Sequence, residues 1–412
     1  MSPVSTVSVP GTSRPGPAQG AAGTGQAGGE PLAARPLRIA FVSETWLPST
    51  DGVVTRLVAT IRQLRALGHE VCMIAPAPAE PVFEGIAVHT VPTVSVAFIA
   101  GGRPWGLPLP RVAAHLDAFR PDLVHVVNPF VIGVAGVIAA RRRRWPLVCS
   151  YHTNVAAYAR FYHMGFTGPA IWTLLRLLHN AADLNLATSD AVRADIVQHG
   201  IRRVDLWERA VDTRFFHPSH RDEAMRRRLS GRHPGAPVAV YVGRLAPEKG
   251  LERLRALTAS RLPMNLAFVG DGPFRDHLER EFAPTGAVFT GMLLGDELAR
   301  AYASADIFLF PSTTDTLGLV VLEALSSGLP VVAADSAPSR EMLEGTGAAR
   351  LFQADSADSL RTTVESLLAP GAEPLRHSLA ENARAEAERH DWRDATERLL
   401  AAYGRVLAAR RA

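Results

Sequence analysis

The stretch PSTTDTLGLVVLEALSSGLPVVAAD (residues 311–335) contains two acidic side chains before its last residue, Asp315 and Glu323, eight positions apart. Serine and threonine precede an apolar segment that is typical of a helix, and the β-branched run from Val331 is typical of a buried strand. A strand, a loop, a helix and a second strand in this order predict a parallel α/β sheet. In such sheets ligands bind beyond the carboxyl ends of the strands, and the segment holding Asp315 follows one of them.

Short apolar strands alternate with helices along most of the chain. The expected strands are 37–44, 69–76, 122–128, 146–152, 182–188, 238–244, 266–272, 287–291, 306–312 and 330–335. Helices are expected between them, the first at 53–68 and another at 189–200 with Ser189 or Asp190 as its cap. Polar, Pro-containing and Arg-rich sequence interrupts the alternation at 213–236. The pattern predicts two doubly wound parallel-sheet domains that face each other across a crevice.

The domain limits follow from the same pattern. Residues 1–36 hold almost no large apolar side chains, so this tail is expected to be disordered. An N-terminal domain at 37–216 and a C-terminal domain at 217–390 are predicted, because the strand pattern restarts after residue 236. The segment 391–412 is expected to be a helix that packs back on the N-terminal domain.

Composition excludes several classes of protein. The chain has 412 residues, 47% of them hydrophobic and 20% charged, which fits a soluble globular protein of more than one domain. Cys72 and Cys149 are the two cysteines; they lie in apolar runs without metal-ligand spacing. No apolar run reaches the roughly 18–20 residues of a membrane span. The formal charge of +4 and the lack of a recognised motif argue against nucleic acid as a partner.

Two loops carry the residues expected to bind a ligand. In VGRLAPEKG (242–250) a strand is followed by Arg244, Glu248 and Lys249, the only lysine of the chain, before the next helix. An arginine fork and a lysine point charge suit a diphosphate, and a charged loop at a sheet edge is the alternative. FVGDGP (268–273) places Gly270 at a second strand end, where a ligand could come close. The full G-x-G-x-x-G fingerprint is absent, which counts against hydride transfer.

The two carboxylates of the opening stretch suit a sugar nucleotide. Asp315, at the mouth of a helix, can accept hydrogen bonds from sugar hydroxyls, and Glu323 can take the two hydroxyls of a ribose. Helix capping by Asp315 and a surface position for Glu323 are the alternatives. Glu323 is embedded in the apolar run VVLEALSSG, and a buried carboxylate needs a partner.

Together these motifs resemble a known family. GRLAPEKG, FVGDGP, SYHTN and the Asp315–Glu323 stretch resemble the retaining GT-B-fold glycosyltransferases of family four, whose E-x7-E motif here begins with Asp315. The resemblance covers nearly everything from Leu37 onward. Through RIAFVSETWLPSTDGVVTRL, SYHTN and VDTRFFHP the chain looks most like the GDP-mannose-dependent α-mannosyltransferases of actinobacteria.

The resemblance implies a role for each matching residue of the C-terminal domain. Arg244 and Lys249 would hold the donor diphosphate and stabilise the leaving group. Glu323 would bind the donor ribose, and Asp315 the hydroxyls of the transferred sugar. The reaction would be retaining, would require no metal and no cofactor, and would take its hexose, expected to be mannose, from a nucleoside-diphosphate sugar, expected to be GDP-mannose.

The remaining residues of the implied site come from both domains. His152, at the end of the strand 146–152, matches the family's active-site histidine. Gly52, in the loop after the first strand, would bring a backbone N–H to the phosphate. The implied donor-binding set is completed by Gly270, Gly318 and Leu319.

Two positions depart from the family pattern and leave the substrates open. Asp51 precedes Gly52 where many relatives have a second glycine, and Ala210 stands in WERAVD where glycine is usual. A UDP-sugar-dependent enzyme acting on a soluble metabolite, such as an antibiotic precursor, is therefore an alternative to a lipid-acceptor mannosyltransferase. A nucleotide-sugar epimerase and a non-catalytic binding relative are further alternatives.

Lipid-acceptor relatives imply a cytoplasmic protein that contacts the inner face of the membrane. Two groups of residues could make this contact with anionic lipids. They are Arg141 to Arg144 with Trp145, and the segment with Phe98, Ile99, Arg103 and Trp105. A solvated, positively charged helix end is the alternative for Arg141 to Arg144, and equally for the cluster Arg226 to Arg228.

Overall fold

The computed structural model describes residues 35–77, 79–95, 104–106, 110–152, 168–260, 262–315 and 317–411. By its internal contacts the chain divides into Met1–Arg35 and Pro36–Ala412, and every element described below belongs to the second unit. The predicted disordered tail 1–36 lies almost wholly outside the described residues, as do Phe98, Ile99 and Arg103.

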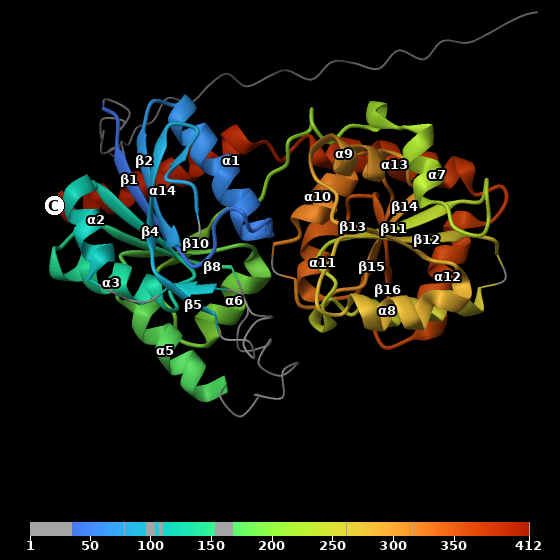
Figure 1. Cartoon of the computed structure of the whole chain (residues 1–412), viewed down its shortest axis with the longest axis horizontal. Coiled ribbons are helices and arrows are strands. Elements are labelled where there is room, and N and C mark those ends of the chain that lie inside the picture. The colour runs from blue at the N-terminus through green and yellow to red at the C-terminus, as the bar shows by residue number, and fades with distance from the viewer. Residues whose placement is uncertain are drawn as a thin grey trace, which may run out of the picture. The chain divides into compact units, whose positions relative to one another are not determined.

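Within the described residues, the first sheet contains eight strands in the order β10-β9-β8-β7-β1-β2-β4-β3 (Figure 1). Neighbouring strands are parallel except β3 and β4, which are antiparallel. The strands are β1 (Arg38–Ser43), β2 (Glu70–Pro76), β3 (Val82–Phe83), β4 (Ile86–Val91), β7 (Leu123–Val127), β8 (Leu147–Tyr151), β9 (Leu184–Ala187) and β10 (Val204–Leu206). A separate antiparallel pair joins β5 (Thr93–Ser95) to β6 (Pro104–Gly106).

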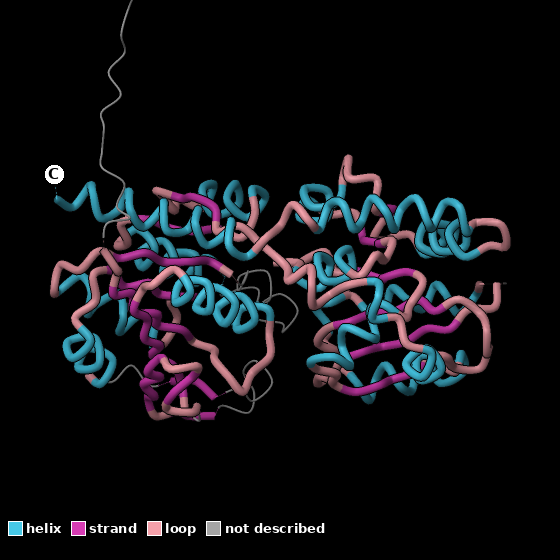
Figure 2. The backbone as a smooth tube through the Cα atoms, turned by 90° about the horizontal axis from the view of Figure 1, so that it is seen from above, coloured by secondary structure: helices cyan, strands magenta, loops and turns pink. Residues whose placement is uncertain are grey.

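The second sheet of the described chain has six strands, all parallel, in the order β13-β12-β11-β14-β15-β16. They are β11 (Val238–Val242), β12 (Asn265–Val269), β13 (Val288–Gly291), β14 (Ile307–Phe310), β15 (Val331–Ala334) and β16 (Ala349–Phe352). Helices flank the strands in the view from above (Figure 2). Strands β11, β12, β14 and β15 are buried throughout, as expected for a parallel sheet that is covered on both faces.

Helices connect the strands in both sheets. Those of the first part are α1 (Gly52–Ala66), α2 (Arg111–Phe119), α3 (Ile132–Arg142), α5 (Gly168–Asn180) and α6 (Asp190–Gln198). Those that follow are α7 (Glu223–Leu229), α8 (Arg275–Phe282), α9 (Gly295–Ala303), α10 (Leu319–Ser326), α11 (Ala337–Leu343), α12 (Ala357–Leu368), α13 (Glu373–Ala387) and α14 (Trp392–Arg411). Short 3-10 helices are η3 (Pro218–His220), η4 (Pro247–Lys249), η5 (Leu251–Ala259) and η6 (Ala283–Thr285).

The predicted α/β architecture of two doubly wound parallel sheets is confirmed, and each of the ten expected strands has a counterpart. Ser189, rather than Asp190, caps α6, because its side chain accepts from the N–H of Val192. One local prediction was wrong, because Gly52 is the first residue of α1 and not part of the preceding loop. The helix expected after Lys249 is present as the 3-10 helix η5.

The chain leaves the first sheet after β10, at Leu206, and enters the second at β11, from Val238. The boundary predicted near residue 216 falls in this connecting segment. The last helix, α14, contacts α1, and its buried Tyr403 hydroxyl lies 2.7 Å from His125 Nδ1 on β7 (Figure 1). The final helix is thereby tied to the first sheet and its first helix.

Glycines at two strand ends allow the backbone to pass close to itself. Gly270 follows β12 with a φ of +137°, and a Cβ there would stand 2.0 Å from the carbonyl oxygen of Gly243, which follows β11. The N–H of Gly270 donates to the carbonyl of Gly291 at 2.9 Å. Only glycine fits this position, because a side chain would meet main-chain atoms that cannot turn away.

Gly270→Ala is therefore expected to destabilise the fold by about 3 kcal/mol, through a disfavoured φ and the collision with Gly243. Thermal unfolding followed by circular dichroism would show a melting temperature several degrees below that of the wild type. Gly168→Ala is the matched control, because a Cβ at Gly168 meets nothing within 4 Å. Equal melting temperatures for the two variants would contradict this account of Gly270.

Candidate active site

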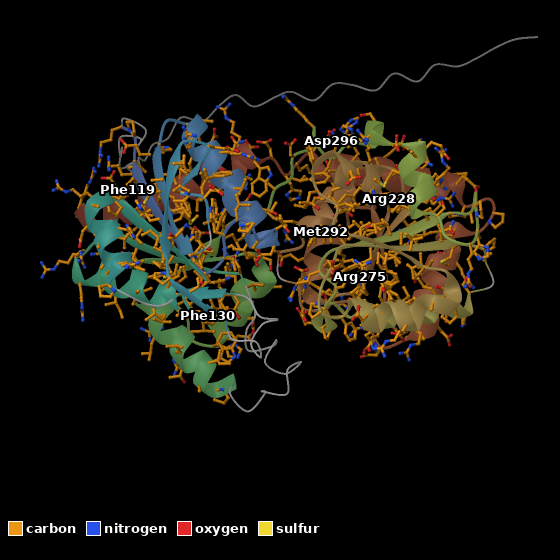
Figure 3. The ribbon with its side chains drawn as sticks, in the orientation of Figure 1. Phe119, Phe130, Arg228, Arg275, Met292 and Asp296 are labelled. Carbon is orange, nitrogen blue, oxygen red and sulfur yellow. The ribbon has the colours of Figure 1, made fainter. Side chains whose placement is uncertain are left out.

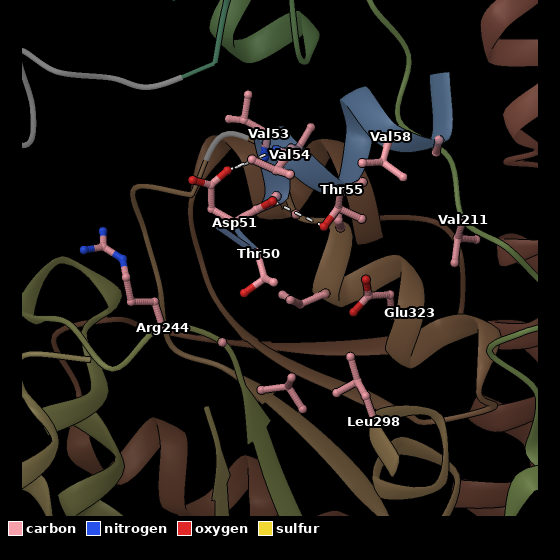
Figure 4. A pocket seen from close by; sticks show the side chains of 18 of the residues that line it. Thr50, Asp51, Val53, Val54, Thr55, Val58, Val211, Arg244, Leu298 and Glu323 are labelled. Atoms are coloured by element: carbon pink, nitrogen blue, oxygen red, sulfur yellow. Dashed lines mark hydrogen bonds between the residues drawn. The ribbon is translucent and has the colours of Figure 1, made fainter. Parts of the chain in front are cut away.

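A cavity of about 890 Å³ is lined by residues from the elements of both sheets. The first turn of α1 and the loop before it form one wall; Arg244 and Glu323 lie on the opposite side (Figure 4). All nine residues implied by the family resemblance line the cavity. They are Gly52, His152, Arg244, Lys249, Gly270, Asp315, Gly318, Leu319 and Glu323. Residues more than 260 positions apart in the sequence thus meet at one pocket.

Lys249 and Asp315 form an ion pair inside this pocket. Lys249 Nζ lies 2.5 Å from Asp315 Oδ2, and their side chains are only 17% and 16% exposed. Asp315 Oδ1 accepts from the N–H groups of Leu317 and Gly318, both at 3.2 Å. Burial opposes ionisation of Asp315, but Lys249 and the two N–H groups outweigh it, so the pKa of Asp315 lies below its usual value.

Asp315 therefore caps the turn before α10 rather than the helix itself, whose N-cap is Gly318. The capping alternative for Asp315 is thus partly right, since its carboxylate does accept backbone N–H groups. The additional contact with Lys249, across 66 positions of sequence, goes beyond capping.

Arg244 pairs with Glu248, which is fully buried, four residues later in the same loop. The guanidinium of Arg244 is about one-third exposed and lines the pocket, as Figure 4 shows. A partly exposed arginine held by a buried carboxylate is positioned for an anionic ligand without losing all its hydration. Arg244 and Lys249 thus place two cations at one end of the cavity.

Glu323, on α10, has the partner that its apolar surroundings require. The hydroxyl of Tyr302, on α9, donates to Glu323 Oε2 at 2.8 Å. Burial raises the pKa of Glu323 to about 7, while the hydrogen bond from Tyr302 opposes this rise. Tyr302 was missed at the level of sequence, because nothing in the motif indicates which distant side chain meets Glu323.

His152 lies at the end of β8 and is 4% exposed. The backbone N–H of His152 donates to Asn128 Oδ1 at 2.9 Å, and its ring Nε2 lies 2.9 Å from the hydroxyl oxygen of Ser150. Burial is the largest cause that lowers the pKa of His152 well below its usual value; Arg56 adds to it. The imidazole is therefore neutral at physiological pH, and Asn128, which also lines the pocket, fixes its backbone.

The start of α1 explains the departure at Asp51. Asp51 is the N-cap of α1 and accepts from the N–H groups of Val53 and Val54 at 3.0 and 3.1 Å (Figure 4). Gly52 follows at the first helical position, and a Cβ on it would lie 3.2 Å from a methyl group of Leu317. Glycine here lets the first turn of α1 approach the loop that holds Asp315.

Ala210, the second departure, is buried in an apolar cluster with Leu317, Leu319, Trp392 and Ala395. This cluster connects the segment after β10 and the start of α14 to the loop before α10. The backbone that holds Asp315 is therefore supported by apolar packing from elements distant in the sequence.

The basic clusters of the sequence are mostly paired. Arg141 and Arg143 lie against Asp183 and Asp117, and Arg143 also lies over the Trp145 ring. Arg226, Arg227 and Arg228 pair with Asp306, Glu223 and Glu297, respectively. Figure 3 shows the position of Arg228 on α7. The charged helix-end interpretation therefore accounts for Arg226 to Arg228.

Among the described residues, one group could hold a metal ion, formed by Glu252, His277 and Glu281. None of the three lines the pocket, so the structure does not connect them with the site. A search of the described helices finds none that is long and apolar enough to cross a membrane.

Comparison with known proteins identifies the family of the chain. Residues 50–215 match the family described as Glycosyltransferase Family 4, and residues 223–386 match Glycosyl transferases group 1. A GDP-mannose-dependent alpha-mannosyltransferase of Mycolicibacterium smegmatis is 39% identical, over 91% of this chain and 99% of its own length. The sulfoquinovosyl transferase SQD2 of Arabidopsis thaliana is 37% identical, over 89% of this chain and 73% of its own length.

Solved structures show the same fold at lower identity. HepE of Anabaena, in complex with UDP and glucose, superimposes with a TM-score of 0.74 at 21% identity, covering 89% of this chain and 99% of that one. The predicted GT-B architecture is confirmed by this similarity. The chain belongs to glycosyltransferase family 4 and is a glycosyltransferase.

Proposed function

We propose that this enzyme transfers mannose from GDP-mannose to a hydroxyl group of a lipid or small-molecule acceptor, with retention of the anomeric configuration. The observation that supports it most strongly is the single pocket that gathers His152, Arg244, Lys249, Asp315 and Glu323. The 39% identity with a GDP-mannose-dependent alpha-mannosyltransferase over nearly the whole chain supports the choice of donor.

The two cations would receive the donor's diphosphate. Arg244 offers a planar set of N–H donors and Lys249 a point charge, and both gain strength in a pocket from which water is excluded. As the bond between the sugar's C1 and the diphosphate oxygen breaks, the negative charge grows on that oxygen, where these cations stabilise it. No cofactor takes part in this step.

Glu323 would accept hydrogen bonds from the ribose hydroxyls through Oε1, the oxygen that does not bind Tyr302. The hydrogen bond from Tyr302 to Oε2 fixes the orientation of the Glu323 carboxylate, and with it the direction in which Oε1 points. Asp315, next to Lys249, would accept hydrogen bonds from hydroxyl groups of the transferred sugar. The donor would contact the backbone of three further residues, Gly270, Gly318 and Leu319.

Retention would follow from attack on the face that the diphosphate leaves. The acceptor oxygen bonds to C1, and its proton passes to a phosphate oxygen of the leaving group, which balances the charge of the step. His152, neutral and held by Asn128, would lie beside the sugar and orient it without carrying a charge of its own. Metal independence stays a prediction.

Peripheral membrane contact is also a proposal, and the ion pairs limit the surface that could make it. Of the four arginines at the end of α3, Arg141 and Arg143 already face Asp183 and Asp117. Arg142 and Arg144 form no ion pair with the described residues, and they are the ones that remain for anionic headgroups.

A donor panel tests the proposed function. With GDP-mannose, GDP-glucose, UDP-glucose and UDP-galactose at equal concentration, GDP-mannose is expected to be consumed fastest, in the presence of a membrane lipid extract as acceptor. Product NMR would show the α-anomer. Faster turnover of a UDP-sugar would favour the alternative, and conversion of the donor without any acceptor would indicate an epimerase.

Lys249→Met is expected to lower turnover by about 10²–10³-fold, because it removes a charge that stabilises the leaving diphosphate. It also leaves Asp315 buried without its cation, which costs about 3 kcal/mol of stability. The double variant Lys249→Met/Asp315→Asn removes both charges and serves as the control: its melting temperature recovers but its turnover does not.

Calorimetry separates the role in binding from the role in folding. Lys249→Met should weaken the binding of GDP much more than the binding of guanosine, which has no phosphate. An equal loss of affinity for GDP and for guanosine would show that Lys249 does not bind the diphosphate.

Glu323 is expected to make nucleotide binding depend on pH. Its pKa of about 7 means that it becomes protonated below neutrality, so a ribose contact that favours the ionised form weakens as the pH falls from 8 to 5.5. In Glu323→Gln, GDP affinity should be lower at pH 8 and should lose this part of its pH dependence. The ratio of wild-type to variant affinity cancels the titration of the nucleotide's own phosphate.

The same variant tests the ribose contact directly. If Glu323 binds the ribose hydroxyls, the penalty of Glu323→Gln should disappear when 2′,3′-dideoxy-GDP replaces GDP. A penalty of the same size for both nucleotides would assign Glu323 another role.

A further inference from the structure

Arg56, on α1, is a buried cation that forms no ion pair with the described residues. It is 0% exposed, and none of its three guanidinium nitrogens has a hydrogen-bond partner in the part of the chain that the structure describes. Thr55 and Val58 on the same helix line the pocket, but Arg56 lies behind that lining. Burial, together with the smaller effect of the Arg209 charge, lowers the pKa of Arg56 to about 9. A buried charged group without partners is costly to the fold, so its presence beside a pocket requires an explanation.

Trp207 connects Arg56 to His152. The guanidinium carbon of Arg56 lies 4.9 Å from the centroid of the Trp207 ring, in a cation–π arrangement. The edge of the same ring meets His152, with centroids 5.2 Å apart, and the ring also contacts His125 at 4.9 Å. Trp207 is 1% exposed, so the three side chains that it touches are held on a rigid, dry support.

In the described part of the chain, the titratable groups that act directly on Arg56 and His152 are all basic. Arg56 from α1, His125 from β7 and His179 from α5 act on His152, and Arg209 acts on Arg56. His125 contacts Tyr403 of α14, and Arg209 is paired with Glu341. Among the described residues, no carboxylate acts directly on Arg56 or His152. The positive charge of Arg56 therefore reaches His152 without compensation from the described part of the chain.

We propose that Arg56 is a positioning residue of the transfer reaction, which acts through Trp207 to keep the His152 imidazole uncharged and in a fixed orientation beside the sugar. This inference rests on the proposed role of His152. A protonated His152 would lose one acceptor nitrogen and would repel the cationic charge that develops on the sugar as the bond to diphosphate breaks. The unpaired arginine prevents this at the expense of stability.

If Arg56 is a positioning residue, its removal should lower turnover without lowering the melting temperature. Removal of a purely structural arginine would lower the melting temperature. Arg56→Met keeps an unbranched side chain over Trp207 but removes the buried charge, so its melting temperature should equal or exceed that of the wild type. Its turnover should fall at least tenfold, with a smaller change in the KM for the donor. The acidic limb of its pH–rate profile should move to higher pH, because a cause that holds the His152 pKa down is gone.

Two further variants serve as controls. Arg65→Met removes an exposed arginine from the same helix, outside the pocket, and should leave the melting temperature, turnover and pH profile unchanged. Arg56→Lys keeps a cation, which is charged at the pH of the acidic limb, so that limb should stay near its wild-type position.

The protonation of His152 can be read without activity. Long-range ¹H–¹⁵N spectra, assigned with His152→Gln, should show an imidazole that stays neutral well below the usual pKa of histidine in the wild type and is protonated at higher pH in Arg56→Met. An unchanged His152 titration in Arg56→Met would overturn the proposal. A large drop in melting temperature, or failure to fold, would also overturn it, because the arginine would then be a structural requirement. Full transfer by His152→Gln would instead remove the proposed role of His152, while the titration and the melting temperature would still report on Arg56.

Discussion

The buried ion pair between Lys249 and Asp315 is the interaction on which the organisation of the site depends. Each member is costly to bury alone, and at 2.5 Å each is the partner that makes burial of the other tolerable. The pair joins the loop after β11 to the loop after β14, two adjacent strands of the second sheet. Backbone N–H groups of Leu317 and Gly318 complete the coordination of the carboxylate. Both loops are thereby fixed at the edge of the sheet where the donor is expected.

The loop that holds Asp315 also contacts the first half of the chain at the pocket. Leu317 lies near Gly52 at the first turn of α1, and it packs with Ala210 and Trp392 in one apolar cluster. This cluster therefore includes the segment that follows β10 and the start of α14. The departures at Asp51 and Ala210 both fall here: one caps α1 and the other fills the cluster.

Sequence reasoning recovered the parts of the structure that depend on local pattern. The ten strands were predictable because each is a short run of apolar residues bounded by turns, and Arg244, Lys249, Asp315 and Glu323 stand in contiguous motifs. Among the strands that it missed, β10 and β16 are three and four residues long and only partly buried, so their sequence carries little periodicity. The 3-10 helix η5 keeps helical spacing and could not be distinguished from an α-helix by pattern.

Pairings between distant residues were beyond the reach of sequence. Lys249 and Asp315, Tyr302 and Glu323, and His125 and Tyr403 are separated by 66, 21 and 278 positions, and only the fold brings them together. Arg56 was missed for the opposite reason: within an amphipathic helix an arginine resembles an ordinary surface residue, and only its burial shows otherwise.

The central claim is that Lys249 receives the donor's diphosphate, and the chain provides a direct way to test it. Lys249 is the only lysine in the sequence, so protein labelled with ¹³C,¹⁵N-lysine gives a single side-chain signal. Titration with GDP should shift the Cε and Nζ resonances of this lysine, saturating at the affinity measured by calorimetry, while guanosine should leave them nearly unchanged. Saturating GDP that binds by calorimetry but does not move the lysine signal would contradict the account.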